Sequence, residues 1–376
     1  MTTTQDYKAD VLGQFFTPEN VVKKMIGLRK NKGSVLEPSA GAGAFISQLE
    51  KSAVGIEIDT NIDFDDARII NSDFFDYSVK NKFDTIIGNP PYVRFQDIAD
   101  STKQKLPMEM FDKRSNLYLF FIAKCMEHLE RKDELIFITP RDFLKATSAK
   151  QMNEALYEEG SITFFEDLGD ARIFEDASPN CAIWRWEKGR TDRRMRNGGL
   201  FHCKNGQIWF GYSSSNETLG DYFDVKVGAV SGADDVYANK NGNVDMVCSQ
   251  TRKTDDTRKM IYNEKRRCLE RHKPRLLGRK IRKFDESNWW EWGRGYHQCS
   301  GKRIYVNAKT RTPNPFYESE IEAYDGSVLA LFPKKGVDCG KAVRKLNNTD
   351  WEKLGFVCDG RMQFTQRSLV NAPFGM

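Results

Sequence analysis

The stretch FDTIIGNPPY, residues 83–92, decides how this chain folds. Phe83 to Ile87 is an apolar run with the length of a buried strand. The two prolines after Asn89 cannot continue a central strand, because they lack amide donors. The chain must therefore leave the sheet at Asn89, at the carboxyl end of the strand, where open α/β sheets bind their ligands.

The tetrapeptide Asn89-Pro90-Pro91-Tyr92 predicts two hydrogen-bond acceptors beside an aromatic ring. Pro91 pushes Pro90 toward an extended conformation, which leaves the Pro90 carbonyl free to point out of the sheet, next to the side-chain oxygen of Asn89. Tyr92 supplies the ring. Such a set suits a planar NH2 group whose two hydrogens need acceptors while its own ring is stacked. An ordinary strand-ending turn is the alternative.

Segments upstream of this strand predict the nucleotide-binding half of a doubly wound sheet. VLEPSAGAGAF (35–45) is a short strand that runs into a glycine loop, 45–49 is amphipathic, and VGIEID (54–59) is a second strand with an acid at its end. The acid of such a unit holds ribose hydroxyls. NSDFF (71–75) then offers a carboxylate for an exocyclic amine and rings for an adenine. The glycine spacing is incomplete, so a dinucleotide is not favoured.

Length, composition and charge indicate an intracellular chain of two domains that binds a polyanion. There are 376 residues, enough for two domains, and residues 1–187 carry a net charge of −8 while 188–376 carry +13. We expect a catalytic domain at 1–214 and a basic second domain at 215–376. The polar start and the absence of a long apolar run predict a cytoplasmic protein that does not enter a membrane.

The cysteines and histidines do not favour a metal. The eight cysteines are scattered and predict reduced thiols, and the four histidines lie away from every motif, so no metal site is expected.

In these motifs the chain resembles N6-adenine DNA methyltransferases of the gamma arrangement, the TaqI-like and Eco57I-like type. The tetrapeptide 89–92, the glycine loop 37–43 and the segment GQFFTP (13–18) occur in that family's order, and 116–118 and 134–140 also fall where the family has them. The resemblance implies an α/β, Rossmann-like sheet that binds S-adenosylmethionine, followed by a mixed α+β target-recognition domain. It also implies double-stranded DNA as substrate, a restriction-modification system or a solitary methylase as context, a monomer, and a separately encoded endonuclease as a partner.

The resemblance and the motif positions together give the candidate site residues. The catalytic candidates are Asn89, Pro90, Tyr92 and Phe174, of which the last is the second ring of a stack around a flipped base. The cofactor-binding candidates are Phe16, Thr17, Glu37, Ala40, Gly41, Gly43, Glu57, Ile58, Asp73, Phe74 and Asn89. Among them, Thr17 is expected to cap the helix that Pro18 begins, Glu57 to accept from the ribose, and Asp73 to accept from the adenine amine.

Cations interleaved with tryptophans in the second half predict contacts with DNA. The candidates are Arg94, Arg275, Arg279, Lys280, Arg282 and Lys283. Trp289, Trp290 and Trp292 follow this cluster, and they can equally belong to a core.

Three other functions fit parts of the pattern. Glutamine methylation poses the same chemical problem as adenine methylation, but there the accessory domain is expected before the glycine loop. An RNA methyltransferase acting on an exocyclic amine would also use a basic second domain. The third is a DNA-binding modification subunit that needs partners for activity.

Overall fold

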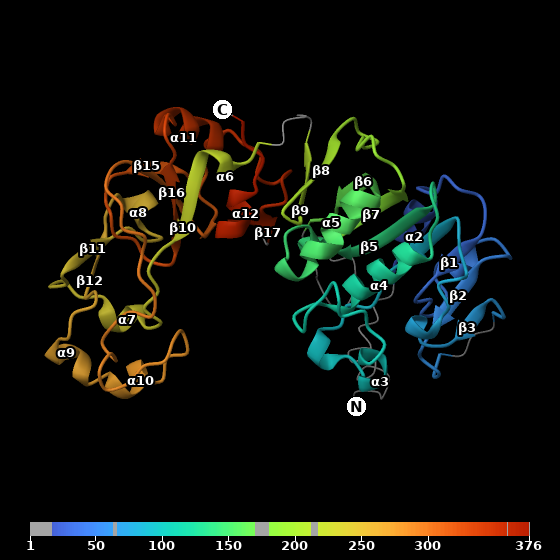
Figure 1. Ribbon diagram of the computed structural model, residues 1–376, viewed down its shortest axis with the longest axis horizontal. Coiled ribbons are helices and arrows are strands. Elements are labelled where there is room, and N and C mark those ends of the chain that lie inside the picture. The colour runs from blue at the N-terminus through green and yellow to red at the C-terminus, as the bar shows by residue number, and fades with distance from the viewer. Residues whose placement is uncertain (1–16, 63–65, 170–179, 212–216, 359, 376) are drawn as a thin grey trace. The chain divides into compact units, whose positions relative to one another are not determined.

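The computed structural model describes residues 17–62, 66–169, 180–211, 217–358 and 360–375, and the chain divides into two compact units, residues 1–214 and 215–376 (Figure 1). The boundary expected between residues 214 and 215 lies within residues 212–216, which are outside the described residues. The catalytic and target-recognition roles of the two units stay predictions.

The first unit is built on a seven-stranded sheet with the order β3-β2-β1-β4-β5-β7-β6. Its strands are β1 (Val35–Glu37), β2 (Val54–Glu57), β3 (Ile69–Asn71), β4 (Thr85–Gly88), β5 (Glu134–Pro140), β6 (Gly160–Asp167) and β7 (Cys181–Lys188). Strands β1 to β5 pair in parallel, whereas β7 runs antiparallel to both β5 and β6. The predicted doubly wound sheet is confirmed.

Helices cover both faces of this sheet, and successive strand residues point to opposite faces. Leu36, Ile86 and Leu135 pack in one core with α4 (Leu117–Glu127) and α5 (Lys150–Glu159). Their chain neighbours Val35, Ile87 and Ile136 pack in the other core with α2 (Glu19–Ile26). This two-sided burial explains why the strands read as unbroken apolar runs.

The order of strands reverses between β1 and β4. The chain passes from β1 outward to β2 and from β4 outward to β5, so the carboxyl ends of β1 and β4 border a crevice, and such a switch point is the ligand site of an open α/β sheet. The glycine loop leaves β1 here, and Asn89 follows β4 directly.

Short and irregular elements connect the strands of the first unit. The amphipathic stretch 45–49 contains a single 3-10 turn, Ile46–Gln48. The segment after the tetrapeptide contains a 3-10 turn, Phe95–Asp97, and the short helix α3 (Asp100–Lys103), and it buries Ile98 and Leu106 in the core beside α4. Strands β8 (Leu200–Lys204) and β9 (Gln207–Gly211) form a separate hairpin.

The second unit combines a four-stranded antiparallel sheet with short helices. The sheet has the order β10-β16-β13-β15, formed by β10 (Phe223–Val227), β16 (Val328–Pro333), β13 (Arg303–Asn307) and β15 (Tyr317–Ser319). The smaller strands are β11 (Val244–Met246), β12 (Arg258–Met260), β14 (Lys309–Thr310), β17 (Val357–Cys358) and β18 (Arg361–Gln363). The helices are α6 (Leu219–Tyr222), α7 (Asp234–Tyr237), α8 (Thr251–Thr254), α9 (Arg267–Glu270), α10 (Lys273–Leu277), α11 (Cys339–Asn347) and α12 (Gln366–Val370). The unit is thus the mixed α+β domain that was predicted.

Candidate active site

A cavity of about 200 Å³ opens at the carboxyl ends of the central strands of the first unit. Its wall combines the ends of β1, β2 and β4, the turn after β3, the segment after the tetrapeptide, and α4. The residues that line it include Ser39, Gly41, Glu57, Ile58, Asp73, Phe74, Asn89, Pro91, Ile98, Thr102, Leu117 and Phe121. Most cofactor candidates that the structure describes therefore lie in or beside one cavity.

Asn89 is held in place from two sides. Its Nδ2 donates to Thr17 Oγ1 at 3.2 Å, and its backbone carbonyl accepts from Ser39 Oγ at 3.0 Å. The hydroxyl of Thr17 therefore contacts the tetrapeptide instead of capping a helix, because the N-cap of α2 is Pro18, which has no side-chain cap bond. The capping role expected of Thr17 is wrong, but its place beside Asn89 brings the two motifs together.

Tyr92 is held in place beside the cavity, and Pro90, two positions earlier, is buried. The Tyr92 hydroxyl donates to the Ile138 carbonyl of β5 at 3.0 Å, and its ring meets Tyr118 of α4 edge to face with centroids 5.9 Å apart. Burial raises the pKa of Tyr92 well above its usual value, so the phenol stays protonated and remains a donor. The ring is thereby fixed in one orientation, as a stacking surface requires.

Glu57 connects the end of β2 to the glycine loop. Its carboxylate accepts from the Gly41 amide at 2.7 Å and from the Asp59 amide at 2.9 Å, and burial raises its pKa. Gly41 and Gly43 have φ of +52° and +82°, a region that favours glycine. Glu57 thus shapes the loop as well as lining the cavity.

Glu37 lies deeper than expected. Its side chain is buried, accepts from the Ile46 amide at 2.9 Å, and has its pKa raised well above the usual value by burial and by the nearby Glu57. Ala40 is buried next to it. Both residues support the loop from behind.

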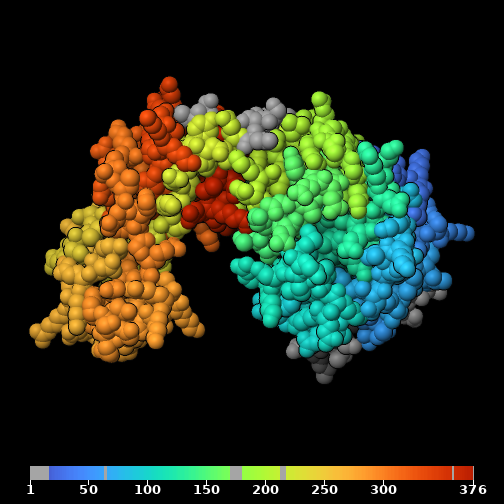
Figure 2. All heavy atoms as spheres, viewed as in Figure 1, coloured from blue at the N-terminus to red at the C-terminus, as the bar shows by residue number. Residues whose placement is uncertain are grey.

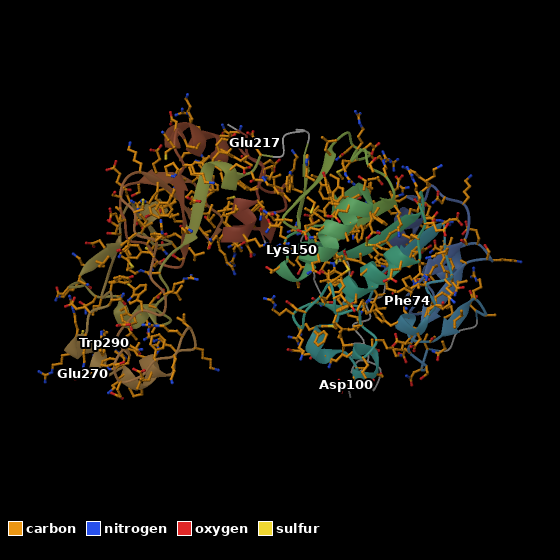
Figure 3. All side chains as sticks on the ribbon, in the orientation of Figure 1. Phe74, Asp100, Lys150, Glu217, Glu270 and Trp290 are labelled. Atoms are coloured by element: carbon orange, nitrogen blue, oxygen red, sulfur yellow. The ribbon has the colours of Figure 1, made fainter. Side chains whose placement is uncertain are left out.

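Asp73 and a set of apolar side chains form another part of the cavity wall. Asp73 caps the 3-10 turn Phe74–Asp76 by accepting from the Phe75 amide at 3.0 Å. Phe74, labelled in Figure 3, meets Phe121 of α4 with centroids 5.1 Å apart. Ile58 is 44% exposed at the end of β2. A carboxylate beside an exposed aliphatic side chain and a buried aromatic ring in the cavity wall suits a purine with an exocyclic amine.

The arrangement of strands, glycine loop and tetrapeptide has a counterpart among known proteins, since residues 40–174 match the family described as Eco57I restriction-modification methylase. Residues 40–174 are an Eco57I-like restriction-modification methylase domain. The cofactor of this methylase domain is S-adenosylmethionine. The acceptors Glu57 and Asp73 and the apolar wall fit its ribose, amine and ring.

Relatives of known class share the methylase domain. The type II methyltransferase M.HincII of Haemophilus influenzae is 35% identical over 191 residues, which cover 48% of this chain and 38% of that protein. M.AccI of Acinetobacter calcoaceticus is 28% identical over 195 residues, covering 45% of this chain and 36% of that protein. The chain therefore spans well under half the length of these curated relatives.

One solved structure is similar over nearly the whole chain. It is the type IIL restriction-modification enzyme MmeI in complex with DNA, with a TM-score of 0.56, 10% sequence identity, and coverage of 94% of this chain and 64% of that one. At this identity the likeness concerns the fold alone.

Two predicted site residues, Phe16 and Phe174, lie outside the described residues. Other residues of the cavity wall were not predicted, notably Ser39, Thr102 and the pair Leu117 and Phe121. The last two are four positions apart, and this spacing puts them on one face of α4. The unbroken apolar run of α4 concealed which face looks into the cavity.

Five of the six predicted DNA contacts fall into three groups. Arg94 in the methylase domain is exposed and pairs with Asp97 at 2.9 Å. Arg275 and Arg282 are exposed but paired, with Asp235 at 2.7 Å and Glu291 at 2.5 Å. Lys280 and Lys283 are exposed and form no ion pair with another described residue.

Arg279 does not fit its predicted role. Its guanidinium is buried and donates to the backbone carbonyls of Leu276, Ser231, Trp289 and Glu291 at 2.6–3.0 Å. It also lies 3.8 Å from the centroid of Phe284. Arg279 therefore holds loops together, and it is not placed to contact phosphate. Trp289 and Trp292 are likewise core residues.

Within the described ranges, no group of three or more His, Cys, Asp or Glu side chains could hold a metal ion. No helix in the part of the chain that the structure describes is long and apolar enough to cross a membrane.

Proposed function

We propose that this chain is a site-specific DNA methyltransferase that transfers a methyl group from S-adenosylmethionine to N6 of an adenine turned out of duplex DNA. One observation carries the proposal. Asn89 of the tetrapeptide stands at the end of β4 in the wall of the same cavity that Glu57 and Asp73 line. The site for the amine that receives the methyl group and the site for the nucleoside cofactor would therefore be adjacent.

The residues at the end of β4 would activate the amine without a strong base. The adenine N6 lone pair is delocalised into the ring, and the nitrogen becomes nucleophilic as it turns pyramidal. The Asn89 side-chain oxygen and the Pro90 carbonyl would accept its two hydrogens and favour that geometry, which stabilises the transition state more than the ground state. S-adenosylmethionine supplies the electrophilic methyl group. The ring of Tyr92 would hold the base by stacking.

The proposed cofactor contacts follow from the cavity wall. Glu57 would accept from the ribose hydroxyls, Asp73 from the adenine amine, and Ile58 and Phe74 would enclose the ring. The second unit would hold the DNA backbone through Lys280, Arg282 and Lys283. The enzyme would act as a monomer and protect sites that a separate endonuclease cuts.

Methyl transfer from labelled cofactor to unmethylated duplex DNA, to RNA and to protein, measured side by side, tests the proposal. We expect label in DNA, and N6-methyladenine after digestion to nucleosides and mass spectrometry, with Asn89→Ala as the inactive control. Detection of N4-methylcytosine instead would agree with methyl transfer to an exocyclic amine but would overturn adenine as the target base. Label in RNA or protein alone would overturn the substrate, and label in DNA only with added partner subunits would identify a modification subunit.

A further inference from the structure

Three donors converge on the carboxylate of Asp73, and two of them come from the segment after the tetrapeptide. Thr102 Oγ1 donates to Asp73 Oδ2 at 2.9 Å, and Lys105 Nζ donates to the same oxygen at 3.1 Å. The Phe75 amide donates to Oδ1 at 3.0 Å. The segment that carries Thr102 includes α3, whose first residue, Asp100, is labelled in Figure 3.

The number of acceptor positions limits what else Asp73 can bind. An ionised carboxylate offers about four lone-pair positions, two on each oxygen. Among the described residues, Oδ2 receives two donors and Oδ1 receives one. One position on Oδ1 remains, and the side chain is only 10% exposed, at the wall of the cavity. That position can accept a hydrogen but cannot donate one.

The two donors also prevent the carboxylate from turning. Thr102 is buried and itself lines the cavity together with Ile98 of the same segment. Lys105 is tied to the turn a second time, through Asp76 at 2.5 Å. The turn after β3 and the segment around α3 are therefore joined at the point where a purine amine would bind. The segment that contains α3, cyan in the space-filling view, lies on the outside of the first unit (Figure 2).

We infer that Thr102 and Lys105 are positioning residues that make the cofactor site selective for a 6-aminopurine. They turn Asp73 so that its remaining acceptor position faces the ring, where it receives a 6-amino hydrogen and repels a 6-oxo oxygen. The inference rests on the proposed contact between Asp73 and the adenine amine. It adds that the selectivity comes from the segment after the tetrapeptide.

Calorimetry of the full chain without DNA tests this selectivity. The two probes are S-adenosylhomocysteine and S-inosylhomocysteine, which differ in the 6-amino and 6-oxo groups. Thr102→Val keeps the branched shape and removes the hydroxyl, so we expect the preference for the amino compound to fall about tenfold, as for one lost hydrogen bond. Lys105→Met, at an exposed position, should lower the preference about threefold. Thr102→Ser should restore it.

Matched variants separate positioning from folding. Lys103 belongs to α3, like Thr102, but its ammonium group contacts Asp100 and the Gln96 carbonyl instead of Asp73. Lys103→Met should therefore leave the preference for the amino compound unchanged. An unchanged preference in Thr102→Val and Lys105→Met, or an equal loss of both probes, would overturn the inference. Asp73→Asn tests the proposed contact between Asp73 and the adenine amine, on which the inference rests. A normal preference in that variant would show that Asp73 does not contact the amine. None of these measurements requires DNA methylation.

Discussion

The amide of Asn89 is oriented by Thr17 and its backbone by Ser39, so the residue is preorganised before substrate arrives. We expect Asn89→Ala to lower kcat by about two orders of magnitude or more, the scale of one lost preorganised contact. Cofactor affinity should change little. Single-turnover methylation together with calorimetry measures both, and near-normal turnover would remove Asn89 from the mechanism.

Glu57 both lines the cavity and accepts a hydrogen bond from the glycine loop. We expect Glu57→Ala to lower cofactor affinity by about 1.5–3 kcal/mol, the value of a charge-assisted hydrogen bond. Since the carboxylate also accepts from the Gly41 amide, Glu57→Gln, which keeps one acceptor oxygen, should lose less. Calorimetry of both folded variants is the measurement, and unchanged binding in Glu57→Ala would exclude the ribose contact.

His128 is a residue that the sequence did not mark. It is buried at the end of α4, stacks on Phe74 and Tyr77, and donates from Nδ1 to the Asn81 carbonyl at 2.8 Å. Burial, with smaller contributions from Lys124 and Lys82, lowers its pKa from 6.5. The unfolded chain therefore binds a proton as pH falls below 6.5 while the folded protein does not yet do so.

Stability should consequently fall with pH in this window. We expect a loss of up to about 1 kcal/mol between pH 7.5 and 5.5 from His128 alone, until its folded-state pKa is reached. Urea unfolding of the wild type and of His128→Gln at both pH values isolates the contribution of His128 to the free energy of unfolding, because the other groups titrate equally in the two proteins. An equal loss in both would show that His128 contributes nothing.

At the scale of elements, the segment from Arg94 to Ser115 is more structured than its mixed composition indicated. Its apolar side chains Ile98, Leu106 and Phe111 are in the core, whereas Lys113 and Arg114 remain exposed. The spacing of those apolar residues follows no regular helix or strand. Sequence patterns therefore indicate no regular element here, and tertiary packing orders the segment.

This segment should still respond to ligands. Because Thr102 and Lys105 contact Asp73, a cofactor analogue and DNA together should reduce trypsin cleavage after Lys113 and Arg114. Timed digestion with mass spectrometry checks this, with DNA alone and the analogue alone as controls. Equal cleavage under all conditions would indicate a segment that does not close.

At the scale of the whole molecule, the division of charge between the two halves predicts a division of labour. Neutralising Lys280, Arg282 and Lys283 together should weaken DNA binding at every sequence, and each lost phosphate contact should reduce the log–log salt slope by about 0.9. Titrations at several salt concentrations measure the slope. A changed choice of site at constant slope would mean that these residues contact bases.

Arg279→Met is the matched control for that experiment. It removes a cation from the same cluster, but one that bonds backbone carbonyls. We expect it to destabilise the second unit by about 1–3 kcal/mol, the cost of leaving buried acceptors unsatisfied. Its effect on the salt slope of the folded protein should be negligible, whereas a phosphate contact would reduce the slope.

The sequence by itself determined the sheet and the position of its site. Prolines cannot continue a strand, glycines permit the loop, and apolar runs require burial on two faces, so the places where β1, β2 and β4 end followed from local chemistry. Glu57 and Asn89 could be named because Glu57 ends β2 and Asn89 directly follows β4, and Asp73 because it lies in the turn after β3. Local rules are sufficient to predict structure where a residue type, such as proline or glycine, has one main effect on the backbone.

Only the tertiary structure decided which partners the polar and charged side chains contact. Arg279 and Lys280 are neighbours in the sequence, yet one is buried among carbonyls and the other is exposed. Thr102 meets Asp73 across 29 residues, and Thr17 meets Asn89 across 72. A cation or a hydroxyl can find many partners, and its partner depends on which distant segments packing brings within hydrogen-bond distance.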